Sequence, residues 1–165
     1  MFINKLINRY KSFNYLQSIL ELSLLAFIIK LPLSFLGMFL VQALGIEGID
    51  IFSANMQIPE ITYEAFILGV FWAPVIETLI AQSLVLFLLS RLGFGTNFKV
   101  FFSAFIFALM HLPVIEFLPS AFGVGFFLAI TYLSKDSKKY LPYISTVLVH
   151  ALHNALAFLL ISLFT

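Results

Sequence analysis

Long stretches of apolar sequence that carry almost no charge limit how this chain folds. They cover residues 65–90, where Glu77 is the one interruption, and residues 100–115, 117–134 and 141–165. A helix needs about 20 apolar residues to cross the hydrocarbon core of a bilayer, and most of these runs reach that length. Alternating apolar and polar segments of about ten residues, which are typical of outer-membrane barrels, are absent from the sequence. The sequence therefore predicts an all-α, polytopic transmembrane helical bundle.

Composition and charge agree with a single integral membrane domain over residues 1–165. Hydrophobic residues make up 62% of the chain and charged residues 10%, and the mean hydropathy is +1.08. A net charge of +1 supplies no basic stripe, so nucleic acid is not expected as a partner. The chain has no cysteine, which excludes disulfides, thiolate nucleophiles and thiolate metal sites.

We expect about five spans. The first apolar region, residues 16–46, is interrupted by Glu21, Lys30 and Pro32 and is longer than one span needs. One long or kinked helix is the prediction for this region. Two shorter pieces are the alternative, and six spans are the alternative count.

Charges in the connections predict the orientation. Basic residues occur before the first span and in two later connections, namely Lys5, Arg9, Lys11, Arg91, Lys99, Lys135, Lys138 and Lys139. Acidic residues occur in the remaining connections, namely Glu47, Asp50, Glu60, Glu64 and Glu116. Because cytoplasmic loops carry an excess of Lys and Arg, we expect the N-terminus in the cytoplasm and the C-terminus outside.

Four polar residues from three predicted helices fall at a similar depth. Counted at about 1.5 Å of rise per residue from the nearest cytoplasmic cation, Glu77, His111 and His150 lie roughly 17 to 21 Å deep, and Asn154 roughly 22 Å. A carboxylate at the bilayer centre costs about 2.5 to 3.5 kcal/mol, so such a group is expected to face the bundle interior. Polar residues that lie at one depth in the bilayer suggest that they form a single site.

Helical spacing separates the residues of the last run. His150 and Asn154 are four residues apart and share one helix face. His153 is offset from both in helical angle, and we expect it to face elsewhere or to contribute a supporting contact.

Together these side chains are suited to activate water. A glutamate and an imidazole can remove a proton, while His and Asn donate hydrogen bonds to an oxyanion. Three alternatives remain open: interhelical hydrogen bonding without catalysis, a proton relay, and a divalent metal such as zinc bound by Glu77, His111 and His150. No other cofactor is expected. An HExxH motif and a GxS nucleophile are absent, and Asp50 and Asp136 lie in loops, which argues against three other intramembrane protease chemistries.

Three motifs occur in a family's order: an acidic motif in "PVIETLIAQ" that contains Glu77, an FxxxH motif from Phe107 to His111, and an HxxxN motif from His150 to Asn154. The chain thereby resembles the CPBP family of glutamic intramembrane proteases. This family includes the type II CAAX prenyl endopeptidases and the bacterial Abi, or bacteriocin-immunity, proteins. The resemblance covers residues 65–158, which are expected to form the catalytic core.

The resemblance implies an intramembrane endopeptidase that hydrolyses a peptide bond of a membrane-associated protein or peptide. Glu77 and His111 would activate the water, and His150 and Asn154 would form the oxyanion hole. Residues expected to support them are Thr78, Gln82, Phe107 and His153. The short chain is similar to prokaryotic members, which suggests the prokaryotic plasma membrane. The alternative is a catalytically inactive membrane partner or bacteriocin self-immunity protein of the same fold.

The first motif departs from the family pattern. The usual EExxxR becomes Glu77, Thr78 and Gln82, so the second glutamate and the arginine are both missing. Thr78 and Gln82 are four residues apart, and we expect a hydrogen bond between them to replace the ion pair.

A further pattern concerns packing. Ala121, Gly125 and Ala129 recur at four-residue spacing, which is typical of a helix face that a neighbouring helix approaches closely.

Overall fold

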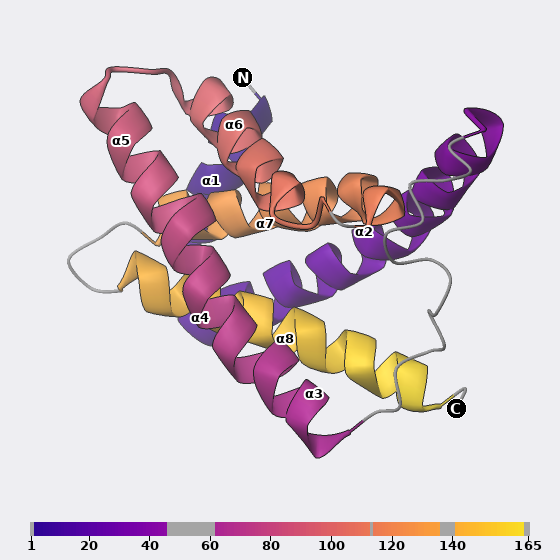
Figure 1. The fold of residues 1–165 in the computed structure, drawn as a ribbon. Coiled ribbons are helices and arrows are strands. Elements are labelled where there is room, and N and C mark those ends of the chain that lie inside the picture. The colour runs from indigo at the N-terminus through magenta and orange to yellow at the C-terminus, as the bar shows by residue number, and fades with distance from the viewer. Residues whose placement is uncertain (1, 46–61, 113, 136–140, 164–165) are drawn as a thin grey trace.

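The fold is an all-α bundle, as predicted (Figure 1). A computed structural model describes residues 2–45, 62–112, 114–135 and 141–163. Five helices are uninterrupted: α1 (Phe2–Ser12), α2 (Tyr15–Ala43), α6 (Thr96–Leu109), α7 (Leu118–Ser134) and α8 (Pro142–Ser162). A short 3-10 turn, η4 (Ile115–Phe117), precedes α7. Residues outside the described ranges include Glu47, Asp50, Glu60, Pro113, Asp136, Lys138 and Lys139, to which several of the loop predictions refer.

Residues 63–91 form one helical segment that changes its winding along its length. It runs through α3 (Tyr63–Ile67), the π-helix η2 (Leu68–Trp72), α4 (Ala73–Glu77), the π-helix η3 (Thr78–Leu84) and α5 (Val85–Arg91). A π-helix has i→i+5 hydrogen bonds, is rare, and often occurs at functional sites. Glu77 ends the α-helical turn between the two π-helices.

Four helical segments are long and apolar enough to cross a bilayer: Tyr15–Ala43, Tyr63–Arg91, Ile115–Ser134 and Pro142–Ser162. The first of them is unbroken and contains Lys30 and Pro32, so the prediction of one long helix is confirmed. The chain is an integral membrane protein.

The fifth apolar helix, α6, is shorter than its predicted run. It has 14 residues and ends at Leu109. Gly93, with φ of 77°, adopts the left-handed conformation in the turn before it. The run continues to Pro113, but residues just before a proline are disfavoured in the α-helical conformation. His111 therefore lies in a turn after α6 instead of at the end of the helix.

The central helix is α7. It packs against α1, α2, α6 and α8 and is the most deeply buried of the long helices. Its small-residue face meets α6, as predicted. A Cβ atom on Gly125 would lie 2.9 Å from Phe107 Cβ and 3.0 Å from Ala104 Cα. Gly125 thus permits the close approach of α6 to α7.

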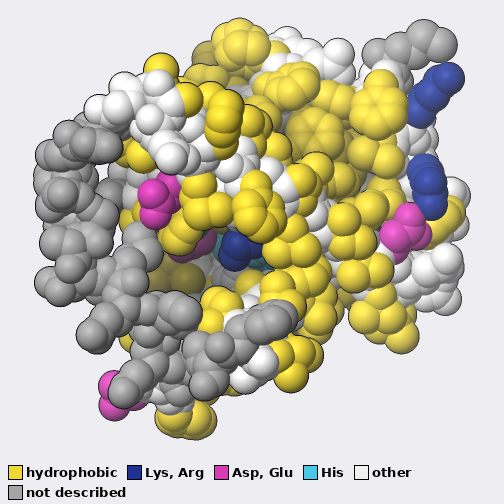
Figure 2. All heavy atoms as spheres, turned by 90° about the vertical axis from the view of Figure 1, so that its right-hand side faces the viewer, with side chains coloured by type: hydrophobic (Ala, Val, Ile, Leu, Met, Phe, Trp, Pro, Cys, Tyr) yellow, Lys and Arg dark blue, Asp and Glu magenta, His cyan; other side chains and the backbone are white. Residues whose placement is uncertain are grey.

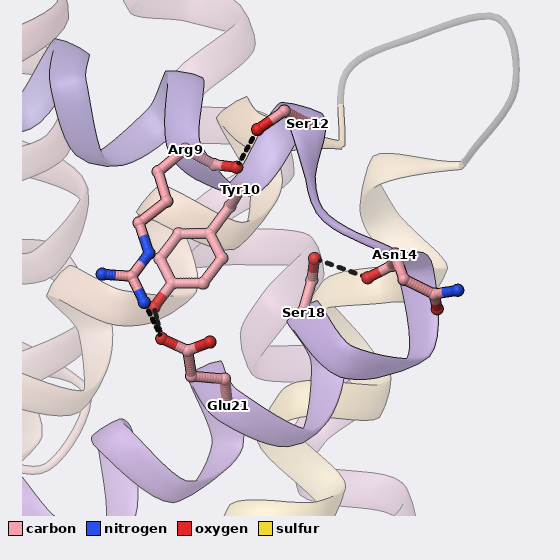
Figure 3. A network of polar contacts seen from close by, with 6 residues as sticks. All are labelled: Arg9, Tyr10, Ser12, Asn14, Ser18 and Glu21. Carbon is pink, nitrogen blue, oxygen red and sulfur yellow. Dashed lines mark hydrogen bonds and ion pairs between the residues drawn. The ribbon is translucent and has the colours of Figure 1, made fainter.

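The N-terminal helix α1 is docked on the end of this bundle. Its Ile3, Ile7 and Tyr10 side chains are buried. Figure 3 shows Arg9 and Tyr10 reaching the same carboxylate, and Arg9 Nη2 and the Tyr10 hydroxyl donate to Glu21 Oε1 at 2.7 and 2.9 Å. These contacts tie α1 to the second turn of α2.

A buried lysine at the end of α7 adds a second connection. Lys135 Nζ donates to the backbone oxygen of Tyr10 at 2.8 Å and to Ser18 Oγ at 3.0 Å. Burial lowers the pKa of Lys135 below its ordinary value. The ammonium group joins α1, α2 and α7 at one end of the molecule.

Gly125→Leu should lower the free energy of unfolding by about 1–3 kcal/mol, because the added side chain overpacks the contact with α6. Gly95→Leu is the matched control, since a Cβ atom on Gly95 meets nothing within 4 Å. The two changes are compared by unfolding in mixed micelles. Equal stability of the two variants would show that the α6–α7 contact does not require a glycine.

Stability should fall as the pH rises from 10 through 12 because of Tyr10. Burial, followed by the hydrogen bond to Glu21, raises the pKa of Tyr10 from 10.0 to about 12. The folded state therefore holds a proton that the unfolded state has lost in this interval, and the stabilisation present below pH 10 disappears. Unfolding measured from pH 9 to 12 should show a flatter profile for Tyr10→Phe than for the parent. Identical profiles would contradict this assignment.

Candidate active site

A cavity of about 150 Å³ brings the predicted site residues together. Its lining comes from α2, from the 63–91 segment, from α6 and the turn after it, and from α7 and α8. The polar side chains in the lining are Lys30, Glu77, His111, Ser120, His150, His153 and Asn154. All four residues predicted to act on the substrate are in this set.

Glu77 faces the bundle interior, as its cost in lipid requires. Its side chain is 22% exposed, and Oε2 lies 3.6 Å from Nε2 of His150, whose side chain is 2% exposed. This separation exceeds the 2.7–3.2 Å of an ordinary N–H···O hydrogen bond. The carboxylate and the imidazole thus face each other while both keep capacity for a further partner.

His111 is oriented by a backbone carbonyl at the end of α6. The His111 N–H donates to the Ala108 oxygen at 2.9 Å instead of the Phe107 oxygen, which continuation of the α-helix would require. The Phe107 oxygen instead lies 3.0 Å from His111 Nδ1. A carbonyl only accepts, so Nδ1 carries a proton, and in the neutral imidazole Nε2 then keeps a lone pair. His111 is held in the tautomer that can act as a base.

Phe107 separates the two imidazoles and contacts both. Its ring centroid lies 5.0 Å from that of His111 and 5.3 Å from that of His150. The Phe107 side chain is buried under Gly125 of α7. The predicted supporting position of Phe107 agrees with these contacts.

Asn154 is held in place by a second backbone carbonyl that accepts no hydrogen bond from within its own helix. The Ala73 N–H donates to the Leu68 oxygen in the π-helical pattern, and Pro74 has no N–H, so the Gly69 oxygen lacks both helical donors. Asn154 Nδ2 donates to this oxygen at 2.7 Å. An amide nitrogen carries two hydrogens, so one N–H remains available in the cavity.

One expectation about the supporting residues is wrong, and for His153 the contacts agree with the alternative of a supporting position. His153 lines the cavity, with its ring centroid 6.1 Å from that of His150, because residues three apart on a helix are also neighbours. The Thr78–Gln82 hydrogen bond is not formed, and the side-chain polar atoms of both residues lack a hydrogen-bond partner within the described ranges. Both residues belong to the π-helix η3, where the α-helical i, i+4 geometry behind the prediction does not apply.

Lys30 is a site residue that the sequence reasoning missed. It was treated as an interruption of the first apolar region, yet its side chain lines the cavity. The sequence did contain a signal for this role, because an ionisable residue within a membrane span usually marks a functional position.

The described part of the chain holds no group of three His, Cys, Asp or Glu side chains arranged to bind a metal ion. Glu77, His111 and His150, the three ligands of the zinc alternative, do line the same cavity.

Fold and site together define a polytopic membrane protein with an acid, imidazoles and an amide around a cavity inside its helical bundle. A family model described as "Type II CAAX prenyl endopeptidase Rce1-like" matches residues 59–156, more than half of the chain. The chain belongs to this family of membrane proteases, and the resemblance to the CPBP proteases is confirmed. No curated protein and no solved structure matches the chain.

Asn154→Asp should lower the free energy of unfolding by about 1–3 kcal/mol, because it replaces the donor to the Gly69 oxygen with an acceptor. Asn97→Asp, at an exposed position in the first turn of α6, is the matched control and should change stability by less than about 0.5 kcal/mol. Unfolding in mixed micelles measures both. If Asn154→Asp were as stable as the parent, the Gly69 contact would not hold α8 against η2.

Proposed function

We propose that this protein is an intramembrane endopeptidase that hydrolyses a peptide bond of a membrane-associated protein or peptide. The observation that carries the proposal is the cavity in which Glu77 and His150 face each other at 3.6 Å and to which His111 and Asn154 also contribute. Membership of a CAAX endopeptidase family supports the same reaction.

Glu77 and His111 are assigned the activation of water. The Glu77 carboxylate accepts a proton as the water oxygen bonds to the carbonyl carbon of the substrate. The free Nε2 lone pair of His111 accepts the second water hydrogen as a hydrogen bond and orients the nucleophile. Water, base and carbonyl are then held together without a covalent enzyme intermediate.

His150 and Asn154 are assigned the oxyanion. When the water oxygen adds to the carbonyl, the carbonyl oxygen becomes negatively charged and accepts hydrogen bonds from His150 Nε2–H and from the remaining N–H of Asn154. Collapse of this intermediate breaks the C–N bond, and the proton on Glu77 passes to the leaving amine. The products are a carboxylic acid and an amine, which exchange a proton to become a carboxylate and an ammonium group, and Glu77 is ionised again.

We infer the orientation from the basic end of the molecule. α1, which carries Lys5, Arg9 and Lys11, packs against the end of α7 through Lys135. The N-terminus and the α5–α6 connection lie toward the same end in Figure 1. The positive-inside rule then puts the N-terminus in the cytoplasm, and we propose the plasma membrane of a prokaryote as the location.

Glu77→Gln should reduce peptide hydrolysis about 10²- to 10⁴-fold, because the amide cannot accept the proton. His150→Ala should cost about 10²- to 10³-fold through the lost oxyanion donor, and His111→Ala about 10²- to 10⁴-fold. The measurement is cleavage of a fluorescent S-farnesylated CAAX peptide, and of its unprenylated form, in proteoliposomes. Glu64→Gln, an exposed carboxylate in the first turn of α3, is the matched control and should cleave as the parent does. Full activity of Glu77→Gln would exclude the glutamate as the base.

A catalytically inactive partner or immunity protein of the same fold is the second candidate. The observation that favours it is the absence of the second glutamate and the arginine, in whose places Thr78 and Gln82 stand. This candidate predicts that the parent shows no more turnover than Glu77→Gln and that the same substitutions only lower stability. The same assay with an added chelator tests the zinc alternative. This alternative predicts that the chelator abolishes activity and that added metal restores it.

A further inference from the structure

Lys30 is a basic residue within α2, a helix that is long and apolar enough to cross a bilayer. It follows the first residue of α2 by 15 positions, roughly 22 Å along the helix. A lysine at the centre of a bilayer costs about 2.5–3.5 kcal/mol, and such residues usually face a cavity or a partner. The position of Lys30 therefore requires a polar surrounding.

The cavity of the candidate active site supplies that surrounding. Lys30 is part of its lining, together with Glu77 and the three histidines. Figure 2 shows a hollow in one face of the molecule with a basic side chain in it and a histidine behind. Within the described residues, no hydrogen bond or ion pair joins Lys30 to another side chain or to the backbone. The cavity thus holds a cation that the described residues do not neutralise.

The cation and the carboxylate do not pair with each other. Glu77 is paired with His150, and no salt bridge links it to Lys30. Lys30 therefore remains able to bind an anionic group other than Glu77.

We propose that Lys30 binds the C-terminal carboxylate of the peptide substrate. This inference rests on the proposed function and assigns Lys30 a role in substrate recognition. A peptide that enters the bilayer as an apolar segment carries one obligatory negative charge, its terminal carboxylate. Ammonium and carboxylate groups form charge-assisted hydrogen bonds, which are stronger than neutral ones, and each removes the cost of burying the other.

Two other anions fit less well. A lipid phosphate lies in the headgroup layer, far from the middle of α2. The oxyanion of the reaction forms at the scissile carbonyl, where His150 and Asn154 are already assigned as its two donors. If Lys30 stabilised the oxyanion, its removal would lower kcat equally for substrates with and without a terminal carboxylate.

The test measures binding, in the Glu77→Gln background, of a fluorescent S-farnesylated CAAX peptide that ends in a free acid or in an amide. With Lys30 present, the free acid should bind about 10- to 100-fold more tightly than the amide. In Lys30→Met this preference should disappear, and Lys30→Arg should retain most of it. Lys99→Met, which removes a half-buried lysine outside the cavity, should leave the preference unchanged.

Equal binding of the acid and amide peptides by the Lys30 protein would overturn the proposal, as would a preference that persists in Lys30→Met. Binding of neither peptide would also overturn it. Lys30→Gln, which keeps a polar side chain, serves as a second uncharged variant if Lys30→Met does not fold, and it should also lose the preference. The binding test involves no turnover. A parent that discriminates the two peptides but never cleaves would therefore refute the proposed hydrolysis and support the Lys30 site.

Discussion

A backbone carbonyl group inside a bilayer needs a hydrogen-bond donor from the protein, and two such carbonyls organise this site. The Gly69 oxygen is left free by a π-helical turn and by Pro74, and the Phe107 oxygen is left free where α6 ends. Water is absent from the hydrocarbon core, so an unpaired carbonyl there costs several kcal/mol. Each carbonyl is satisfied by a polar side chain of the site, Asn154 in one case and His111 in the other.

The interruptions in regular helical hydrogen bonding therefore orient the side chains of the candidate active site. The bond to the Phe107 oxygen fixes the tautomer of His111, and the bond to the Gly69 oxygen fixes the amide of Asn154 while one N–H stays free. Glu77 ends an α-helical turn that is flanked by two π-helices, in which the backbone is wound differently. Part of this irregular backbone, at Gly69 of η2, lines the cavity, which is a place where a membrane protein tolerates irregular backbone.

Several elements could be predicted from the sequence because they depend on local physics. The apolar runs are so long that a helical bundle is the expected outcome, and the cost of Glu77 in lipid requires that it face inward. The four-residue spacing of His150 and Asn154 places both on one face of a helix. The small-residue repeat around Gly125 indicated a close helix contact, and this contact is with α6.

Other features depended on interactions between distant segments. The sequence by itself determined the class of fold and the polar residues that had to lie inside it, because insertion into lipid sorts side chains by polarity. Only the tertiary structure decided that Lys30 and His153 line the cavity and that Thr78 and Gln82 do not pair. The physical reason is that π-helical winding and the approach of α2 to α8 arise from packing between helices, which the local pattern of one helix does not specify.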